Sequence, residues 1–111
     1  MLAPHFEMDN LTAIVDQNGI QLDGRCCDIM GIEPLADKWR AFNWNAIEID
    51  GHDINQILKA LKEARETKGK PTVIIAHTIK GKGVSFMEGN VNFHGKAPNA
   101  QETEIALKEL E

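Results

Sequence analysis

The hexapeptide TVIIAH, residues 72–77, constrains the fold of this chain more than any other stretch. It is a nearly continuous apolar run, preceded by the turn-forming KGKP at 68–71. Runs of this kind are typical of strands that are buried on both faces of a parallel sheet. Parallel strands need long crossover connections, so the rest of the chain must supply helices and further strands.

Strand and helix patterns do alternate along the chain. Short apolar segments at 11–16 and 45–50 predict two more strands, and LTAIVD at 11–16 ends in a polar break. The segment 33–44 predicts a helix that starts at Pro34, with Leu35, Trp39 and Phe42 on one face. The order strand, helix, strand, helix, strand predicts an α/β fold, with a partial parallel sheet flanked by helices.

The two remaining helices have clear start signals. Residues 53–66 predict a helix with a capping box from Asp53 to Gln56, and its expected apolar stripe is Ile54, Ile57, Leu58 and Leu61. Residues 80–99 have no clear period and predict a long functional loop. The closing helix is capped by Asn99 and Glu102, and its expected inner face is Ala106, Leu107 and Leu110.

Composition and charge exclude several classes of protein. The 111 residues suffice for one small domain with a real core. A net charge of −5 argues against nucleic acid as a main partner, and no apolar run approaches a membrane span. The N-terminal MLAPHFEMDN lacks a basic start and a signal-length apolar stretch, so we expect a cytoplasmic protein. Cys26 and Cys27 are adjacent and are expected to be free thiols.

Two polar segments follow expected strands, where open α/β sheets bind ligands. In the first, Asp16 to Gly24, the Asn18 amide oxygen, a backbone carbonyl and the carboxylates of Asp16 and Asp23 are ligands that Mg²⁺ accepts. The same residues also suit a plain turn, in which Asn and Gly serve only the backbone conformation. Both interpretations stay open at this point.

The second segment, HTIKGKG at 77–83, is basic in an otherwise acidic chain. Gly81 and Gly83 allow successive amides to form an anion-binding concavity, and Lys80 adds a positive charge for a phosphate. A solvated basic turn is the alternative, since neither a P-loop nor a dinucleotide fingerprint is present. His94, in a polar loop, is a candidate acid or base, whereas nothing in the sequence assigns a role to His5 or His52.

Four motifs, taken in order, resemble transketolase over almost the whole chain. They are DNLTAIVDQNGIQLDG, PLADKWRAFNWNAIEIDGHD, KPTVIIAHTIKGKGVSFME and FHGKAP. The resemblance is to the N-terminal subunit of the split, two-chain transketolases. Deoxyxylulose-phosphate synthases share the Gly-Lys-Gly loop and are less similar around NGIQLDG.

The resemblance implies a thiamine-diphosphate enzyme that moves a two-carbon ketol unit from a ketose phosphate to an aldose phosphate. It implies that the Asn18 side chain and the Ile20 carbonyl bind the Mg²⁺ that holds the diphosphate. It places Leu22 near the thiazolium ring, Lys80 close to the cofactor, and His94 in the active site, where it assists proton transfers.

The resemblance also implies that residues 1–111 are the C-terminal part of a thiamine-diphosphate-binding domain. That family's cofactor motif begins with Gly-Asp-Gly, which this chain lacks. We therefore expect the chain alone to be inactive. Its expected partners are the remainder of the diphosphate domain, a pyrimidine-binding subunit and sugar phosphates, in a homo- or hetero-oligomer.

A different class of function is a non-catalytic assembly module. It would self-associate through an unpaired sheet edge and through apolar faces bearing Trp39, Phe42 and Trp44. A generic nucleotide-binding α/β domain is a third possibility, and the missing glycine fingerprint counts against it.

Overall fold

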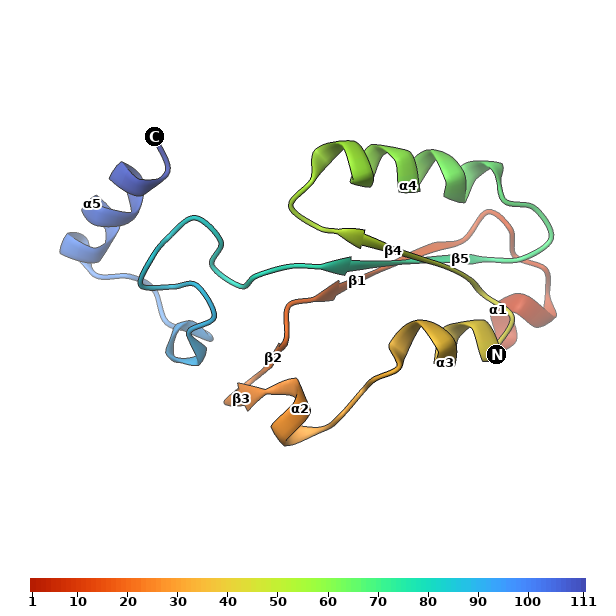
Figure 1. The fold of residues 1–111 in the computed structure, drawn as a ribbon, viewed down its shortest axis with the longest axis horizontal. Helices are drawn as coiled ribbons and strands as arrows, with labels where there is room; N and C mark the ends of the chain where they lie inside the picture. Colours follow the sequence, from red (N-terminus) through yellow and green to blue (C-terminus); the bar gives the residue numbers. More distant parts are fainter. The chain divides into compact units, whose positions relative to one another are not determined.

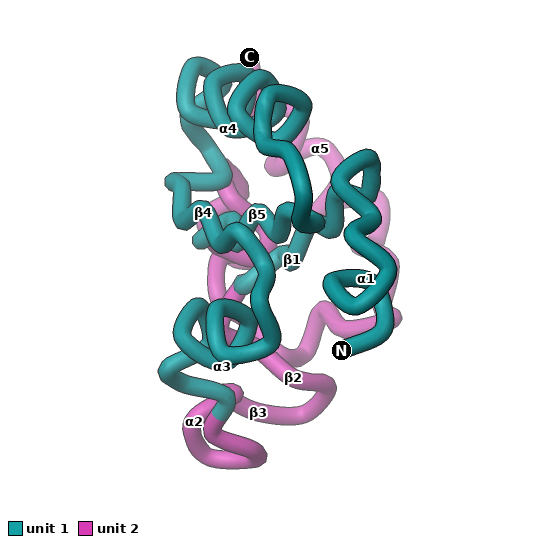
Figure 2. Tube along the Cα trace, turned by 90° about the vertical axis from the view of Figure 1, so that its right-hand side faces the viewer, with its two compact units in different colours: residues 1–17, 32–78 teal, residues 18–31, 79–111 magenta.

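A computed structural model describes all 111 residues, Met1–Glu111. The elements along the chain, drawn in Figure 1, are α1 (Leu2–His5), β1 (Thr12–Gln17), β2 (Ile20–Gln21), β3 (Gly24–Arg25), α2 (Cys26–Ile29), α3 (Leu35–Ala41), β4 (Asn45–Asp50), α4 (Ile54–Glu66), β5 (Thr72–His77), η1 (Val91–Phe93) and α5 (Ala100–Glu109). The chain divides into two compact units (Figure 2). Unit 1 is Met1–Gln17 with Ile32–Thr78, and unit 2 is Asn18–Gly31 with Ile79–Glu111.

Unit 1 is built on a three-stranded sheet in the order β1-β5-β4, and both pairings are parallel. β5 is the central strand, and every residue from Thr72 to Ala76 is buried, as the apolar run predicted. The expected α/β class, with a partial parallel sheet flanked by helices, is thereby confirmed.

Helices cover the sheet on two faces, with the core divided between them. On the α4 face, Ile49, Ile74 and Ala76 pack with Ala60 and Ala64 of α4. On the other face, the buried residues are Ala36, Trp44, Val73 and Ile75. The Trp44 ring, 9% exposed, meets that of Trp39 edge to face at 4.8 Å. Trp44 is therefore not available for the self-association considered above, and Trp39 is partly buried.

The inner face of α4 differs from the predicted one. Of the expected stripe only Ile57 packs against the core, and the buried residues of α4 are Ala60 and Ala64. Alanine has the small side chain that lets a helix lie close to a sheet, and the long apolar side chains one step around the helix stay exposed. Asp53 caps the helix as predicted by accepting from the Asn55 and Gln56 amides. The capping box is only half formed, because the Gln56 Oε1 accepts from the Asp50 amide instead.

The other two predicted helices also shift. α3 begins at Leu35, with Pro34 as its N-cap, and Phe42 lies beyond its end with its side chain exposed. The capping box of α5 between Asn99 and Glu102 is confirmed. Its expected inner face is wrong, because Leu107 and Leu110 are both exposed and only Ala106 is half-buried.

Unit 2 contains elements that the sequence patterns did not predict. The hairpin β2–β3 has two residues in each strand, and α2 and η1 are single turns, so none of them is long enough to show a period. The stretch predicted as a loop, 80–99, is irregular apart from η1. None of the helices has both the length and the apolar character needed to cross a membrane.

Candidate functional site

The two predicted site loops leave the sheet from neighbouring strands. β1 and β5 are paired in register up to Gln17 and His77, and the Thr78 amide donates to the Gln17 carbonyl at 3.3 Å. Asn18 starts the first loop directly afterwards, and Ile79 starts the second. Both loops thus begin at the carboxyl edge of a parallel sheet, where ligands bind in open α/β folds.

Asn18 closes a tight turn on its own backbone. Its Oδ1 accepts from the Ile20 amide at 3.0 Å, and Gly19 has a φ of +74°, a conformation that glycine adopts without strain. The Gly19 carbonyl accepts from the Cys26 amide at 2.9 Å, which closes the base of the β2–β3 hairpin. The turn expected at this point is therefore formed, and one of the two lone pairs of the Asn18 oxygen is used in it.

The same turn leaves the Ile20 carbonyl directed away from the hairpin. Ile20 lies opposite Arg25, next to the hydrogen-bonded Gly19 and Cys26. Because hydrogen-bonded and non-bonded pairs alternate in an antiparallel ladder, Ile20 and Arg25 form a non-bonded pair. The Ile20 amide turns outward to Asn18, and the Ile20 carbonyl turns outward beside it. Two neutral oxygens are thus presented along one edge of the hairpin.

Leu22 forms the tip of this hairpin. It has a φ of +47°, unusual for a residue with a side chain, and its side chain is half-exposed at 52%. An apolar side chain held outward at a strained turn is available for contact with another molecule. Functional sites often carry residues in such conformations.

The basic loop binds an anion of its own. The Gly83 amide donates to the Glu88 Oε1 at 2.9 Å, and the Lys82 Nζ lies 3.6 Å from the same oxygen. The Lys82 and Val84 amides bond to the Ile79 and Gly81 carbonyls. In the predicted anion-binding loop, the Gly83 amide and the Lys82 ammonium group therefore contact the chain's own Glu88 carboxylate.

Lys80 differs from Lys82 in that no carboxylate pairs with its ammonium group. Its side chain is half-buried, and its carbonyl accepts from the Gly89 amide at 2.9 Å, which fixes the backbone. This leaves a positive charge at the start of the loop that follows β5. A positive charge without a carboxylate partner suits an anionic ligand.

His94 lies in the same unit, directly after η1. Its amide donates to the Val91 carbonyl at 3.0 Å, and its side chain is exposed. Phe93 beside it packs against Phe86 with ring centroids 5.5 Å apart, and the Lys96 Nζ lies 5.1 Å from the Phe93 ring. The aromatic pair holds the backbone of this loop, and no described contact joins His94 to the Asn18 turn.

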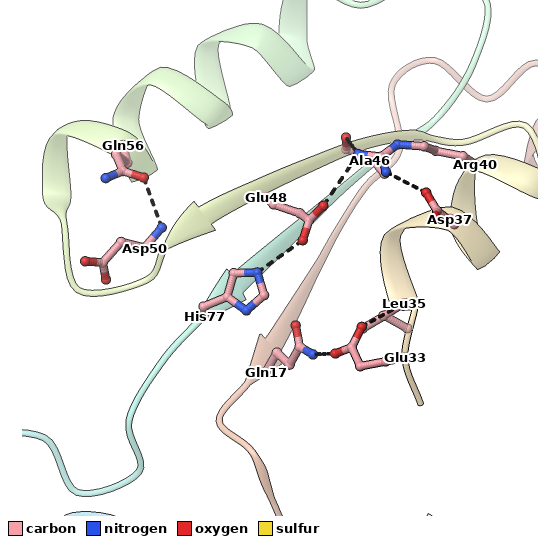
Figure 3. Close-up of polar contacts among 10 residues, drawn as sticks. All are labelled: Gln17, Glu33, Leu35, Asp37, Arg40, Ala46, Glu48, Asp50, Gln56 and His77. Carbon is pink, nitrogen blue, oxygen red and sulfur yellow. Dashed lines mark hydrogen bonds and ion pairs between the residues drawn. The ribbon is translucent and has the colours of Figure 1, made fainter. Parts of the chain in front are cut away.

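A row of polar contacts at the carboxyl edge was not predicted (Figure 3). The His77 Nε2 lies 3.2 Å from the Glu48 Oε2, and Glu48 in turn lies 3.6 Å from Arg40. Gln17 donates through its Nε2 to Glu33, while its buried Oε1 has no partner. Parallel register and alternation could have indicated this row, because Gln17, Glu48 and His77 share one face of the sheet.

Comparison with known proteins decides the family. Residues 1–110 match the family described as "Transketolase, thiamine diphosphate binding domain". The chain belongs to this family. It is 37% identical over 110 residues to a subunit of the apulose-4-phosphate transketolase of Phocaeicola vulgatus, and 42% identical over 111 residues to the 6-deoxy-6-sulfo-D-fructose transketolase subunit SqwG of a Clostridium species.

These matches cover 99% and 100% of the chain but only 39% and 40% of the two relatives. The chain thus spans about two fifths of the length of these transketolase subunits. Among solved structures, the transketolase of Campylobacter jejuni superposes with a TM-score of 0.88 at 31% identity, over 97% of this chain and 17% of that one. A transketolase of Pichia stipitis gives 0.87 at 28% identity, over 97% of this chain and 16% of that one. The resemblance drawn from the four motifs is confirmed.

The residues present fit only part of a metal-diphosphate site of this family. The Asn18 and Ile20 oxygens are hard, neutral donors of the kind Mg²⁺ accepts beside phosphate and water. The chain has no group of three or more His, Cys, Asp or Glu that could hold a metal ion. The Asn18 and Ile20 oxygens are therefore neutral donors that no cluster of charged ligands in this chain accompanies.

Proposed function

We propose that this chain is a segment of a two-chain transketolase, which transfers a two-carbon ketol unit between sugar phosphates with thiamine diphosphate and Mg²⁺. The observation that carries the proposal is the match of residues 1–110 to the thiamine diphosphate binding domain of transketolase. The names of two relatives as transketolase subunits support the two-chain arrangement.

The roles proposed for the residues are those that the resemblance to the family implies. The Asn18 Oδ1 and the Ile20 carbonyl would hold the Mg²⁺ ion that binds the diphosphate. Leu22, at the hairpin tip, would pack near the thiazolium ring, and the ammonium group of Lys80 would lie close to the cofactor. His94, exposed on its loop, assists proton transfers on the sugar. Thiamine diphosphate, when bound, supplies the chemistry of two-carbon transfer.

The complete site needs polypeptide other than residues 1–111. Two neutral oxygens cannot balance the charge of Mg²⁺, and the carboxylate of a Gly-Asp-Gly motif is absent from residues 1–111. We place that carboxylate in the remainder of the diphosphate domain, and we assign cofactor activation to a pyrimidine-binding subunit. The chain alone is therefore inactive, and titrating it with thiamine diphosphate and Mg²⁺ in a calorimeter should give no micromolar binding.

A chimera tests the function itself. Residues 1–111 replace the matching segment of the Phocaeicola vulgatus subunit, which is then combined with its partner subunit. We expect ketol transfer from a ketose phosphate that depends on thiamine diphosphate, and we expect Asn18→Ala to lower it at least tenfold. Asn55→Ala, which removes an exposed amide on α4, is the matched control. A chimera that folds but transfers no ketol unit, or an Asn18→Ala variant as active as the control, would contradict the proposal.

An unpaired sheet edge favours a second candidate, a non-catalytic module that self-associates. β1 is an edge strand with no partner on its outer side. Size-exclusion chromatography with light scattering separates the two candidates, since a stable oligomer of residues 1–111 without cofactor affinity supports the module.

A further inference from the structure

The segment that carries the two candidate Mg²⁺ donors is an excursion from unit 1. It comprises residues 18–31, leaves unit 1 after Gln17 and returns to it at Ile32. Asn18 and Ile20 lie close in sequence to the point of departure. The direction of their oxygens therefore depends on how firmly the chain is held where the segment leaves and where it returns.

The departing end is fixed to the end of the central strand β5. The Gln17 carbonyl accepts from the Thr78 amide at 3.3 Å, and the Asp16 carboxylate accepts from the Thr78 hydroxyl. Ala13 and Val15 pack on the core of the α3 face, so the half-buried Gln17 side chain, further along the same alternating row, lies on that face as well.

The returning end is fixed to α3. The Ile32 carbonyl accepts from the Lys38 Nζ at 2.8 Å, and the Glu33 Oε2 accepts from the Leu35 amide at 2.9 Å. Leu35 packs against the core cluster that contains the buried Ala36. Glu33 is thus held at the first turn of a helix that is itself anchored on the sheet.

One side-chain contact joins the two ends (Figure 3). The Gln17 Nε2 donates to the Glu33 Oε1, so Glu33 uses one oxygen for the start of α3 and the other for the end of β1. Closing a flexible segment at its base removes conformations that the open segment would sample. The contact therefore restricts residues 18–31 through two side chains that are not themselves candidate Mg²⁺ donors.

Stability alone does not account for the glutamine at position 17. Its Oε1 is buried and has no hydrogen-bond partner within residues 1–111. A buried polar atom without a partner costs about as much stability as one hydrogen bond to an exposed group contributes. Glu33 is exposed, so the one bond that Gln17 makes does not clearly outweigh this cost. An apolar side chain of the same length, such as methionine, would avoid the cost altogether.

We propose that Gln17 is a positioning residue of the cofactor site, which acts through its hydrogen bond to Glu33. The inference rests on the proposed function, in which Asn18 and Ile20 hold the Mg²⁺ ion. The bond closes the base of residues 18–31, so that the two donor oxygens are presented in one arrangement before the ion binds. Such preorganisation favours binding, because less conformational freedom is lost when the ion and the diphosphate arrive.

The first experiment measures the isolated chain without cofactor. Gln17→Met keeps the length of the side chain and removes both of its polar atoms. We expect the Ile20 and Cys26 amides, which bond within the segment at 3.0 and 2.9 Å, to exchange hydrogen at least threefold faster. The melting temperature should stay the same or rise, because the unpaired oxygen is gone. Gln101→Met, which replaces an exposed glutamine on α5, is the matched control.

Variants of Glu33 test whether the effect passes through this one bond. Glu33→Met removes the acceptor and should speed the exchange of the Ile20 and Cys26 amides as Gln17→Met does. The double variant should exchange no faster than either single variant, because each substitution removes the same bond. Glu33→Gln keeps an oxygen that can accept from Gln17, so its exchange rates should stay within twofold of those of the unchanged chain.

The second experiment measures the consequence for the cofactor. It uses the chimera with the Phocaeicola vulgatus subunit, combined with its partner subunit. We expect Gln17→Met to raise the KM for thiamine diphosphate at least fivefold and to lower kcat by a smaller factor, while Glu33→Gln stays within twofold. A residue that only stabilised the fold would instead lower the melting temperature and leave the KM unchanged.

Four results would overturn the proposal. They are amide exchange in Gln17→Met equal to that in Gln101→Met, a lower melting temperature in Gln17→Met, single effects that add in the double variant, and an unchanged KM in an active chimera. Faster exchange with the expected behaviour of the double variant, in a chimera that transfers no ketol unit, speaks against the proposed function alone. An active chimera in which Gln17→Met matches its control speaks against the positioning role alone.

Discussion

At the scale of single residues, Gly81 shows how the loop after β5 depends on a missing side chain. Its φ is +73°, and a Cβ there would come within 2.7 Å of the Met87 carbonyl oxygen. Real contacts are essentially never so close, and the obstacle is backbone, which does not rotate away. Gly89 has a similar φ of +63° but open space around it. A comparison of alanine substitutions at the two positions therefore separates the effect of the backbone conformation from that of the steric clash with Met87.

We predict that Gly81→Ala destabilises the loop more than Gly89→Ala. Forcing alanine into a left-handed conformation costs about 1 kcal/mol at either position. The clash with Met87 adds to this cost only at Gly81, giving on the order of 2–3 kcal/mol there. Hydrogen exchange of the Gly89 and Asn90 amides measures the difference, since both bond within this loop. Equal protection in the two variants would contradict the prediction.

The Asn18 turn shows what single residues reveal in a sequence. Asn followed by Gly predicted a turn, and the same pair was a candidate for metal binding. The structure forms the turn, and the turn directs the Ile20 carbonyl outward. The two interpretations are therefore compatible, because one lone pair of the amide oxygen closes the turn and the other stays available.

At the scale of elements, α5 is held at its C-terminal end by one carboxylate. The Glu109 side chain accepts from the Ser85 hydroxyl and the Ser85 amide, each at 2.6 Å. These two hydrogen bonds hold the pKa of Glu109 below its usual value of 4.5. The apolar residues Leu107 and Leu110 are exposed, so this contact contributes to the position of the helix where packing contributes little.

We predict that this contact weakens in acid. A carboxyl group whose pKa is lowered by folding stabilises the folded state above its unfolded pKa, and this stabilisation is lost as pH falls through the folded pKa. The Ser85 amide resonance should therefore shift below about pH 4.5, the usual carboxyl value. Glu109→Gln should remove that titration, and a variant that titrates like the unchanged chain would contradict the assignment.

The helix α4 shows which properties of an element its sequence pattern predicts and which it does not. Its existence, its cap at Asp53 and nearly its whole length were predicted. Its inner face was not, because the apolar stripe suggested by hydrophobicity is rotated from the row of Ala60 and Ala64. Close packing on the sheet selects small side chains, and a hydrophobic period does not report how closely two elements approach.

At the scale of the whole chain, the acidic residues are dispersed. No three metal-ligating side chains gather, and the two candidate oxygens are neutral. A ligand that binds only the folded state stabilises it by RT ln(1 + [L]/Kd), where [L] is the free ligand concentration. The response of the isolated chain to Mg²⁺ therefore reports how much of the site it contains.

We predict that millimolar Mg²⁺ leaves the melting temperature of residues 1–111 unchanged, and that EDTA leaves it unchanged as well. The physical reason is that neutral oxygens alone cannot remove the hydration shell of Mg²⁺. Differential scanning calorimetry measures both effects, with NaCl at equal ionic strength as the control. A rise specific to Mg²⁺ would show that the chain holds the ion unaided.

The sequence by itself determined the parallel sheet, the three main helices, the caps of α4 and α5, and the family. Each of these depends on local pattern, on capping residues or on the order of motifs, all of which are written along the chain. Only the tertiary structure decided that Glu88 accepts a hydrogen bond from Gly83 in the basic loop and that Ile20 turns its carbonyl outward. It also decided that β1 is an edge strand of the sheet. These features depend on which strands become neighbours and on which backbone groups their pairing leaves unused, and no local pattern encodes either.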